Sequence, residues 1–181
     1  TEKDWIEATE WLVDGNPETG IDYYELYERE GFSYPSEAYG IMSWWDYGHY
    51  ITTIGERIPN SNPFQAGVSG TYGAAQVLTS TDENAVVQKL NHLRTKYVMT
   101  DYQMAGSKFG AMAIWANPAV QTEPYYTHLL QQSSGGSYSV VTGYTEEYYN
   151  TLTVRLQNFD GSYTEADSVI LALTDSSAGY G

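Results

Sequence analysis

Cysteine, basic residues and long apolar runs are missing or scarce in this chain of 181 residues. Without cysteine, the chain has neither disulfides nor thiol chemistry. Its 8 Lys and Arg residues stand against 23 Asp and Glu residues, which gives a net charge of −15. Because such a chain repels phosphate backbones and anionic headgroups, we expect no nucleic-acid partner. No run of the sequence approaches the ~18 apolar residues that a membrane-spanning helix needs.

The length is sufficient for one domain with a substantial hydrophobic core. The chain does not begin with Met, and we expect it to be a fragment of a longer protein or a processed product. The spacing of apolar residues and the position of capping residues predict mainly helices in the first three quarters of the chain. The expected helices cover residues 1–13, 43–54, 69–78, 81–95 and about 101–116, with a short one within 122–132. Extended segments are expected at 57–59 and 97–99.

The pattern changes near the C-terminus. From 152 to 157 apolar and polar residues alternate, Asp160-Gly161 supplies a turn, and an apolar run follows at 168–173. Two short alternating or apolar runs around such a turn are typical of a β-hairpin. The sequence therefore predicts a hairpin in this part of the chain.

The expected fold class is α+β, with a mainly helical core and a C-terminal antiparallel β-hairpin or small sheet. We place the helical core at about 1–132 and the β-rich tail at about 138–175. Together they are expected to form a single soluble domain over 1–181.

The stretch Trp44-Trp45-Asp46-Tyr47-Gly48 holds two indoles, a carboxylate and a phenol in five residues. An indole N–H only donates hydrogen bonds, and an ionised carboxylate only accepts them. Side by side, they can take the proton of a small hydroxyl and also hydrogen-bond its oxygen. This is the chemistry that recognises a Ser or Thr side chain. The alternative is an aromatic packing cluster with Asp46 as a helix cap.

A second segment carries Asp101, Met104, Lys108 and Met112 at spacings of 3, 4 and 4 residues. This spacing places them on one face of a helix that begins near Asp101. Two glycines four residues apart in the same segment would allow a bend. The alternative reading makes Asp101 an N-cap, the two methionines core residues and Lys108 a surface group.

In this order the two motifs resemble the signature of the catalytic subunit of oligosaccharyltransferase, and its archaeal form in particular. In that family the Trp-Trp-Asp-Tyr-Gly motif is accompanied by a second motif on a kinked helix. The second motif begins with Asp and carries Lys and then Met or Ile at four-residue spacing. Archaeal members have a variant with a Met-containing insertion, and residues 101–112 look like that variant.

The resemblance implies transfer of an oligosaccharide from a lipid-linked carrier to the Asn side chain of Asn-X-Ser/Thr in an acceptor polypeptide. In the family, the catalytic carboxylates and the divalent metal (Mn or Mg) lie in an N-terminal multi-span membrane region. That region is absent here, so the resemblance implies no catalytic residue, no cofactor and no metal ligand in this fragment, which alone would be inactive. It places the domain on the extracytoplasmic face of the cell membrane, where the lipid-linked oligosaccharide is reached through the missing region.

By the same resemblance, the first motif would bind the hydroxyl at the +2 position of the acceptor, and the second would complete the pocket. Such a pocket rejects an acceptor without a hydroxyl because its own polar groups would lose their partners. A Thr methyl buried on an indole or thioether adds about 0.8 kcal/mol, so Thr should be preferred over Ser. The residues expected to bind substrate are Trp44, Trp45, Asp46, Asp101, Met104, Lys108 and Met112.

Two other functions stay open at this point. A carbohydrate-binding module also uses aromatic faces with neighbouring carboxylates, and aromatic residues make up 15% of this chain. A purely structural extracellular domain would bury Trp44, Trp45 and Asp46 with no cleft beside them.

Overall fold

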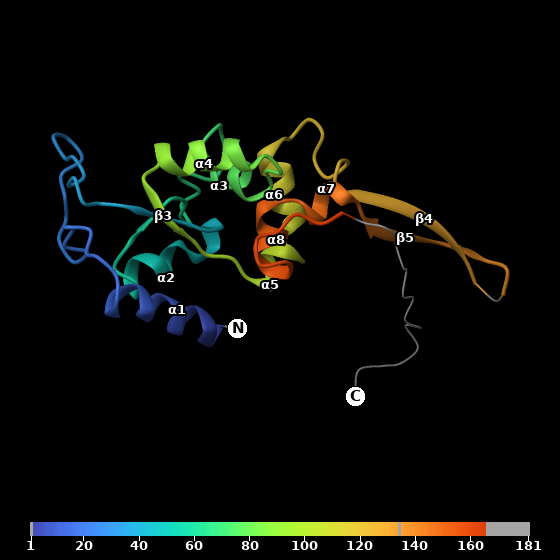
Figure 1. Ribbon diagram of the computed structural model, residues 1–181, viewed down its shortest axis with the longest axis horizontal. Helices are drawn as coiled ribbons and strands as arrows, with labels where there is room; N and C mark the ends of the chain where they lie inside the picture. The colour runs from blue at the N-terminus through green and yellow to red at the C-terminus, as the bar shows by residue number, and fades with distance from the viewer. Residues whose placement is uncertain (1, 134, 166–181) are drawn as a thin grey trace.

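The computed structural model describes residues 2–133 and 135–165, in which short helices surround a small parallel sheet and a β-hairpin projects from the opposite end (Figure 1). In chain order, the elements are α1 (Glu2–Asp14), β1 (Gly40–Met42), the 3-10 helix η1 (Trp45–Tyr47), α2 (Gly48–Thr53), β2 (Ile58–Pro59), α3 (Ala74–Leu78), α4 (Glu83–His92), β3 (Thr95–Val98), α5 (Tyr102–Ala105), α6 (Phe109–Ala116), β4 (Tyr126–Gln132), β5 (Tyr138–Tyr144), α7 (Glu146–Tyr149) and α8 (Leu152–Asn158). The expected α+β class is confirmed. None of the helices in the described ranges has the length and apolar character to cross a bilayer.

The parallel sheet brings the two sequence motifs to one edge. Its strand order is β2–β1–β3, with Gly40 opposite Ile58 on one side and Met42 opposite Val98 on the other. The sequence does not predict β1, since a strand of three residues shows no periodicity. The first motif follows β1 and the second follows β3, so both leave the sheet at the carboxyl ends of neighbouring strands. Open sheets with parallel strands bind their ligands at this edge.

Helices α1 and α4 agree best with the sequence prediction. Helix α1 buries Trp5, Thr9 and Leu12, which lie on one side at helical spacing. Helix α4 begins after Asp82, whose side chain accepts a hydrogen bond from the Ala85 N–H at 3.0 Å. Where a helix runs for more than two turns, the apolar spacing and the N-cap together are sufficient. The shorter elements agree less well, because α3 covers only half of its predicted range and β3 starts two residues early and is half-buried.

The segment 43–54 is not one helix, as the sequence predicts, but the short helix η1 followed by α2. Ser43 is not its N-cap. The Ser43 carbonyl accepts a hydrogen bond from the Ser61 hydroxyl at 2.8 Å, and Trp44 occupies the capping position in an extended conformation. The backbone thus stays extended at Trp44, two residues beyond the end of β1, before the chain turns.

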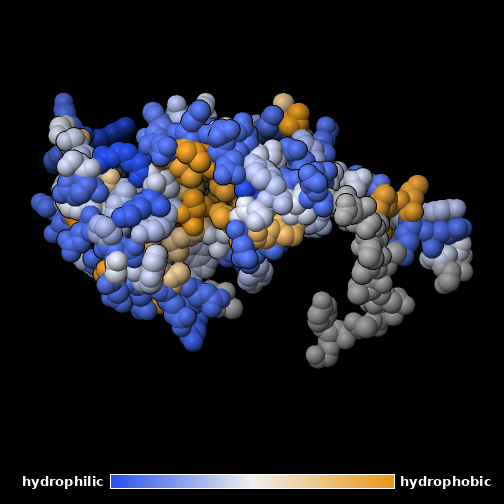
Figure 2. All heavy atoms as spheres, in the orientation of Figure 1, coloured by the Kyte–Doolittle hydropathy of each residue, from blue (hydrophilic) through white to orange (hydrophobic). Residues whose placement is uncertain are grey.

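The main core lies behind the first motif, where α3, α5, α6 and α8 meet. Its fully buried members include Trp44, Met104, Phe109, Met112 and Val154. A second core, formed by Leu12, Tyr39, Ile41 and Ile51, joins α1, β1 and α2. The face of the molecule seen in Figure 2 is mostly hydrophilic, and a strip of apolar residues crosses its middle below α4.

Residues 152–157 form the helix α8 and not the strand that their alternation predicts. Thr153, Val154 and Arg155 are consecutive and all buried, whereas a strand with one buried face would alternate. Packing against α3 and α5 decides the structure here over the local pattern. The predicted return strand at 168–173 lies outside the described residues.

The hairpin lies earlier in the chain than predicted. Strands β4 and β5 pair antiparallel, from Tyr126 opposite Tyr144 to Gln132 opposite Tyr138. The short helix predicted within 122–132 is therefore wrong. The segment 126–132 is a strand because it pairs with β5, and a short window of sequence does not show this pairing.

The predicted division of the chain into two parts needs the same correction. Strand β4 lies within the expected helical core of 1–132, and α7 and α8 lie within the expected β-rich tail of 138–175. That 1–181 form a single domain stays a prediction.

Candidate functional site

Because η1 is a tight turn, the side chains of the first motif point in different directions, some into the core and some toward the surface. Trp44 is 2% exposed and belongs to the core, as the packing alternative has it. Trp45 and Asp46 are half-buried, and Tyr47 is 6% exposed. The motif therefore combines a packing residue with two side chains that solvent reaches.

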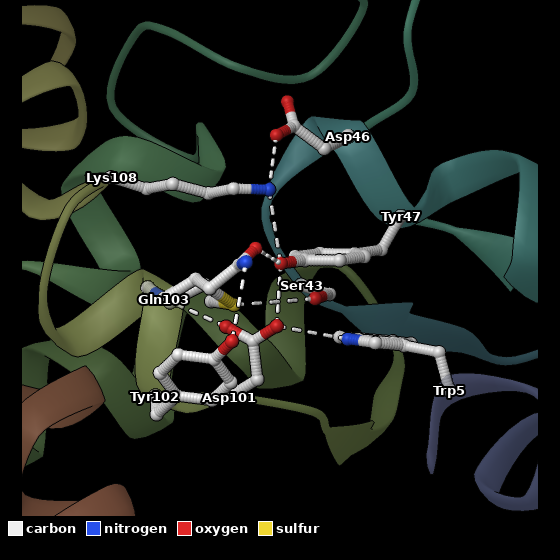
Figure 3. A network of polar contacts seen from close by, with 9 residues as sticks. Trp5, Ser43, Asp46, Tyr47, Asp101, Tyr102, Gln103 and Lys108 are labelled. Carbon is white, nitrogen blue, oxygen red and sulfur yellow. Dashed lines mark hydrogen bonds and ion pairs between the residues drawn. The ribbon is translucent and has the colours of Figure 1, made fainter. Parts of the chain in front are cut away.

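An ion pair joins the two motifs (Figure 3). The Lys108 ammonium donates to Asp46 Oδ2 and, at 3.0 Å, to the Tyr47 hydroxyl. It also lies 4.3 Å from the centroid of the Tyr47 ring, a cation–π distance. The Lys108 and Asp46 side chains are 23% and 28% exposed, so the pair is neither freely solvated nor deeply buried. Lys108 is thus not the surface group of the alternative reading.

The second oxygen of Asp46 is left without a hydrogen-bond partner in the part of the chain that the structure describes. Among residues 2–133 and 135–165, no group hydrogen-bonds Asp46 Oδ1, although that atom is buried. Buried acceptors in folded proteins nearly always have a donor, and leaving one without costs about 1–3 kcal/mol. Asp46 Oδ1 is therefore an unpaired buried acceptor among the described residues.

Asp101 holds the neighbouring groups and does not reach Asp46. Its Oδ1 accepts from the Met104 N–H at 2.8 Å, which makes Asp101 the N-cap of α5. Its Oδ2 accepts from Trp5 Nε1 at 3.0 Å and from the Tyr47 hydroxyl at 2.5 Å. All these donors belong to the protein, so Asp101 has a supporting role in this arrangement.

The protonation of Tyr47 fixes the direction of these hydrogen bonds. Burial, and then the hydrogen bond and charge of Asp101, raise the pKa of Tyr47 above its ordinary value. The phenol therefore keeps its proton, and it donates that proton to the Asp101 carboxylate. Its oxygen remains as an acceptor for Lys108.

The second motif does not lie on one continuous helix. Helix α5 ends at Ala105 with Gly106 as its C-cap, and α6 begins at Phe109 with Lys108 in the N-capping position. The predicted common face is thus wrong, because the chain bends between Met104 and Lys108. The predicted bend does occur, at Gly106, and it places Lys108 beside the first motif, whereas Gly110 lies within α6.

The two methionines of the second motif are fully buried. Met104 and Met112 lie in the main core, and the Met104 sulfur accepts a hydrogen bond from Ser43 Oγ at 3.8 Å. They form the back of the site and have no exposed surface. Their predicted contact with substrate stays a prediction, which this burial disfavours.

Sequence reasoning missed Trp5. As part of the apolar stripe of α1 it reads as an ordinary core residue, yet its indole stacks on Tyr47 and donates to Asp101. No local signal could identify it, since the contact with Asp101 joins residues 96 positions apart.

Beside these groups the surface is hollowed. A pocket of about 310 Å³ is lined by Glu2, Trp5, Tyr47, Tyr50, Asp101 and Gln103. Metal ligands do not gather here or elsewhere in the described part of the chain, where no three His, Cys, Asp or Glu side chains are placed to hold an ion. The described residues therefore do not fit a metal site.

Comparison with known proteins finds archaeal glycotransferases that are similar in sequence to this chain. The chain is 34% identical over 189 residues to dolichyl-phosphooligosaccharide-protein glycotransferase 3 of Archaeoglobus fulgidus, which covers 88% of this chain and 22% of the relative. It is 34% identical over 190 residues to the dolichyl-monophosphooligosaccharide-protein glycotransferase AglB of Haloferax volcanii, with 92% and 18% covered. The chain thus spans about a fifth of the length of these relatives.

A solved structure has the same fold. It is the crystal structure of the Archaeoglobus fulgidus oligosaccharyltransferase tethered with an acceptor peptide containing the NVT sequon. The TM-score is 0.75 at 34% identity, with 88% of this chain and 22% of that chain covered. The model of the family described as "AglB core domain" matches residues 2–105, more than half of the chain. This match confirms the resemblance drawn from the motifs, and the chain belongs to the AglB core-like family.

Proposed function

We propose that this chain is the part of an archaeal oligosaccharyltransferase that recognises the acceptor sequence Asn-X-Ser/Thr. In this proposal the hydroxyl of Ser or Thr donates to Asp46 Oδ1, while Lys108 holds Oδ2. The observation that carries the proposal is the buried Oδ1 atom, which has no donor in the described chain. The similarity to a structure that holds an NVT-sequon peptide supports it.

The ion pair suits Asp46 for this task. Because Lys108 donates to only one carboxylate oxygen, the carboxylate keeps one acceptor position free. A hydroxyl that binds there replaces a missing hydrogen bond, and an alanine or valine side chain leaves the oxygen unpaired. The half-buried Trp45 is the indole that we assign to the contact with the acceptor side chain beside Asp46. Trp44, Met104 and Met112 support it from the core.

The remaining parts of the reaction are assigned to the longer protein. We propose that it works on the extracytoplasmic face of the membrane. We also propose that it takes the oligosaccharide from a dolichyl-linked donor, which the names of the relatives indicate for those proteins. A divalent metal such as Mn or Mg would bind outside the described residues, which offer no suitable cluster.

The test uses the full-length enzyme that contains this chain. Asp46→Asn and Asp46→Ala are compared with the unchanged enzyme on acceptor peptides with Thr, Ser or Ala after Asn-X. Removing a hydrogen bond to a charged group costs about 1.5–3 kcal/mol, so we expect kcat/KM for the Thr peptide to fall by a factor of at least about ten. Glu10→Gln, on the exposed side of α1, is the control and should have no effect. Unchanged glycosylation by Asp46→Ala would contradict the proposal.

A further inference from the structure

We infer that Trp5 and Asp101 are positioning residues that set the Asp46–Lys108 pair through Tyr47. The inference rests on the proposed function, since it concerns how the same acceptor site is held in place. It assigns Asp101 a role other than direct contact with substrate, and it adds a residue from α1, outside both motifs.

The first contact is a ring stack. The Trp5 and Tyr47 rings lie parallel, with centroids 3.9 Å apart and an interplanar angle of 8°. Both side chains are 6% exposed. Helix α1 therefore covers one face of the Tyr47 ring, while the Lys108 ammonium approaches the ring at 4.3 Å from its centroid. The phenol cannot turn away without opening this packing.

The second contact fixes the polarity of the network (Figure 3). Indole N–H is only a donor and an ionised carboxylate only an acceptor, so the bond from Trp5 to Asp101 has one possible direction. The Tyr47 hydroxyl has a single proton, and it donates to Asp101 at 2.5 Å in preference to the neutral Gln103 Oε1 at 3.3 Å. The hydroxyl oxygen is then available to Lys108 at 3.0 Å.

The consequence reaches the acceptor site. Lys108 has two acceptors, the Tyr47 oxygen and Asp46 Oδ2. With both bonds made, its ammonium stays on Oδ2, and Oδ1 keeps no donor within the described chain, so it can accept from the substrate hydroxyl. If the Tyr47 hydroxyl no longer donates to Asp101, its oxygen is no longer held as an acceptor for Lys108. Lys108 is then held by the Asp46 carboxylate alone and can move to either of its oxygens. Trp5 and Asp101 thereby keep the binding oxygen of Asp46 free.

The test compares matched tryptophan variants of the full-length enzyme. Trp5→Phe keeps an aromatic ring for the stack but removes the N–H donor. Trp11→Phe makes the same change on the same helix, where the side chain is 55% exposed. For Trp5→Phe we expect the KM of the Asn-X-Thr peptide to rise about threefold to tenfold, with kcat unchanged. For Trp11→Phe we expect both constants to stay the same.

A second variant and a double mutant separate positioning from folding. Asp101→Asn keeps an oxygen to cap α5, but its amide NH2 then takes the place of Oδ2 and accepts from neither Trp5 nor Tyr47, so the KM should rise at least as much. Because Trp5 acts through Lys108, Trp5→Phe should raise KM much less in a Lys108→Gln background than in the unchanged enzyme. A merely structural role would lower the melting temperature and show no such coupling.

These experiments distinguish a failure of the inference from a failure of the proposed function on which it rests. If Asp46→Asn raises KM and Trp5→Phe does not, the inference is wrong and the proposed function stands. Equal effects of Trp5→Phe with and without Lys108 also overturn the inference. If Asp46→Asn and Asp46→Ala both leave kcat/KM for the Thr peptide unchanged, the proposed function itself is wrong, and the inference is lost with it.

Discussion

Lys108 binds Asp46 across the edge of the sheet, although the two residues follow different strands and lie 62 positions apart. The parallel pairing of β1 with β3 brings the start of both motifs to the same place. The bend after α5 then directs the lysine toward the carboxylate. This ion pair and the bonds of Tyr47 with Lys108 and Asp101 thus join the two parts of the sequence signature, and Asp46 Oδ1 is left without a donor in the described part of the chain.

Replacing Lys108 should weaken acceptor binding more than folding. Lys108→Met keeps the length of the side chain but leaves Asp46 Oδ2 without its cation. The carboxylate can then rotate, and the free oxygen is no longer fixed. We expect KM for an Asn-X-Thr peptide to rise about tenfold, as for a lost hydrogen bond to a charged group. The measurement is steady-state kinetics of the full-length enzyme.

The matched control for that change is Lys3→Met. Lys3 pairs with Glu7 on the surface of α1, and the two side chains are 80% and 61% exposed. Exposed pairs contribute little, so KM should not change. A similar rise in KM for both variants would show that net charge, and not the contact with Asp46, is responsible.

Trp45 should determine the preference for Thr over Ser. A Thr methyl that packs on the indole contributes about 0.8 kcal/mol, which corresponds to about a fourfold higher kcat/KM for Thr. In Trp45→Ala the ratio of the two kcat/KM values should fall toward one. The Ser peptide supplies the internal control, since it lacks the methyl group. If the Thr-to-Ser ratio of kcat/KM is unchanged in Trp45→Ala, the Thr methyl does not pack on Trp45.

The raised pKa of Tyr47 predicts a loss of stability in alkali. Burial and Asp101 favour the protonated phenol in the folded chain, whereas an unfolded tyrosine titrates at about 10. Below that pH both states hold the proton, and this contribution to stability is complete. Above it the unfolded state releases the proton first, so the free energy of unfolding falls as the pH rises.

The check is denaturant unfolding at several pH values above the ordinary tyrosine range. Other buried tyrosines, among them Tyr148, share the raised pKa and contribute to the same loss. Tyr47→Phe removes only one contribution and should therefore show a shallower decline than the unchanged chain. Tyr24→Phe is a matched control because Tyr24 is 82% exposed, and its decline should equal that of the unchanged chain.

The sequence predicts what depends on neighbours in the chain. Helix α4 has its cap at Asp82, Asp101 caps α5, and the order of the motifs identifies the family. It does not predict what depends on distant partners. The bond from Trp5 to Asp101 is one example, and the helix at 152–157 is another, since packing on α3 and α5 decides it. Neither feature can be predicted from a short stretch of neighbouring residues.

The last residue of the first motif should be intolerant of a side chain. Gly48 has an ordinary helical backbone, so its conformation alone would accept alanine. A Cβ there, however, would lie 2.8 Å from Asn62 Cα and 2.8 Å from the Ser61 carbonyl oxygen. Both are backbone atoms, so the loop after β2 would have to shift. Overpacking of this kind costs about 1–3 kcal/mol of stability.

Gly15 provides the comparison for this substitution. A Cβ at Gly15 would meet nothing within 4 Å. Gly15→Ala should therefore change the free energy of unfolding by less than about 0.5 kcal/mol, whereas Gly48→Ala should lower it by about 1–3 kcal/mol. Urea unfolding of the two variants measures the difference. Because the displaced loop includes Ser61, which binds the Ser43 carbonyl just before the indoles, Gly48→Ala should also raise the KM for acceptor. Equal stability of the two variants would mean that the loop moves freely, and the glycine of the motif would then need an explanation in substrate binding.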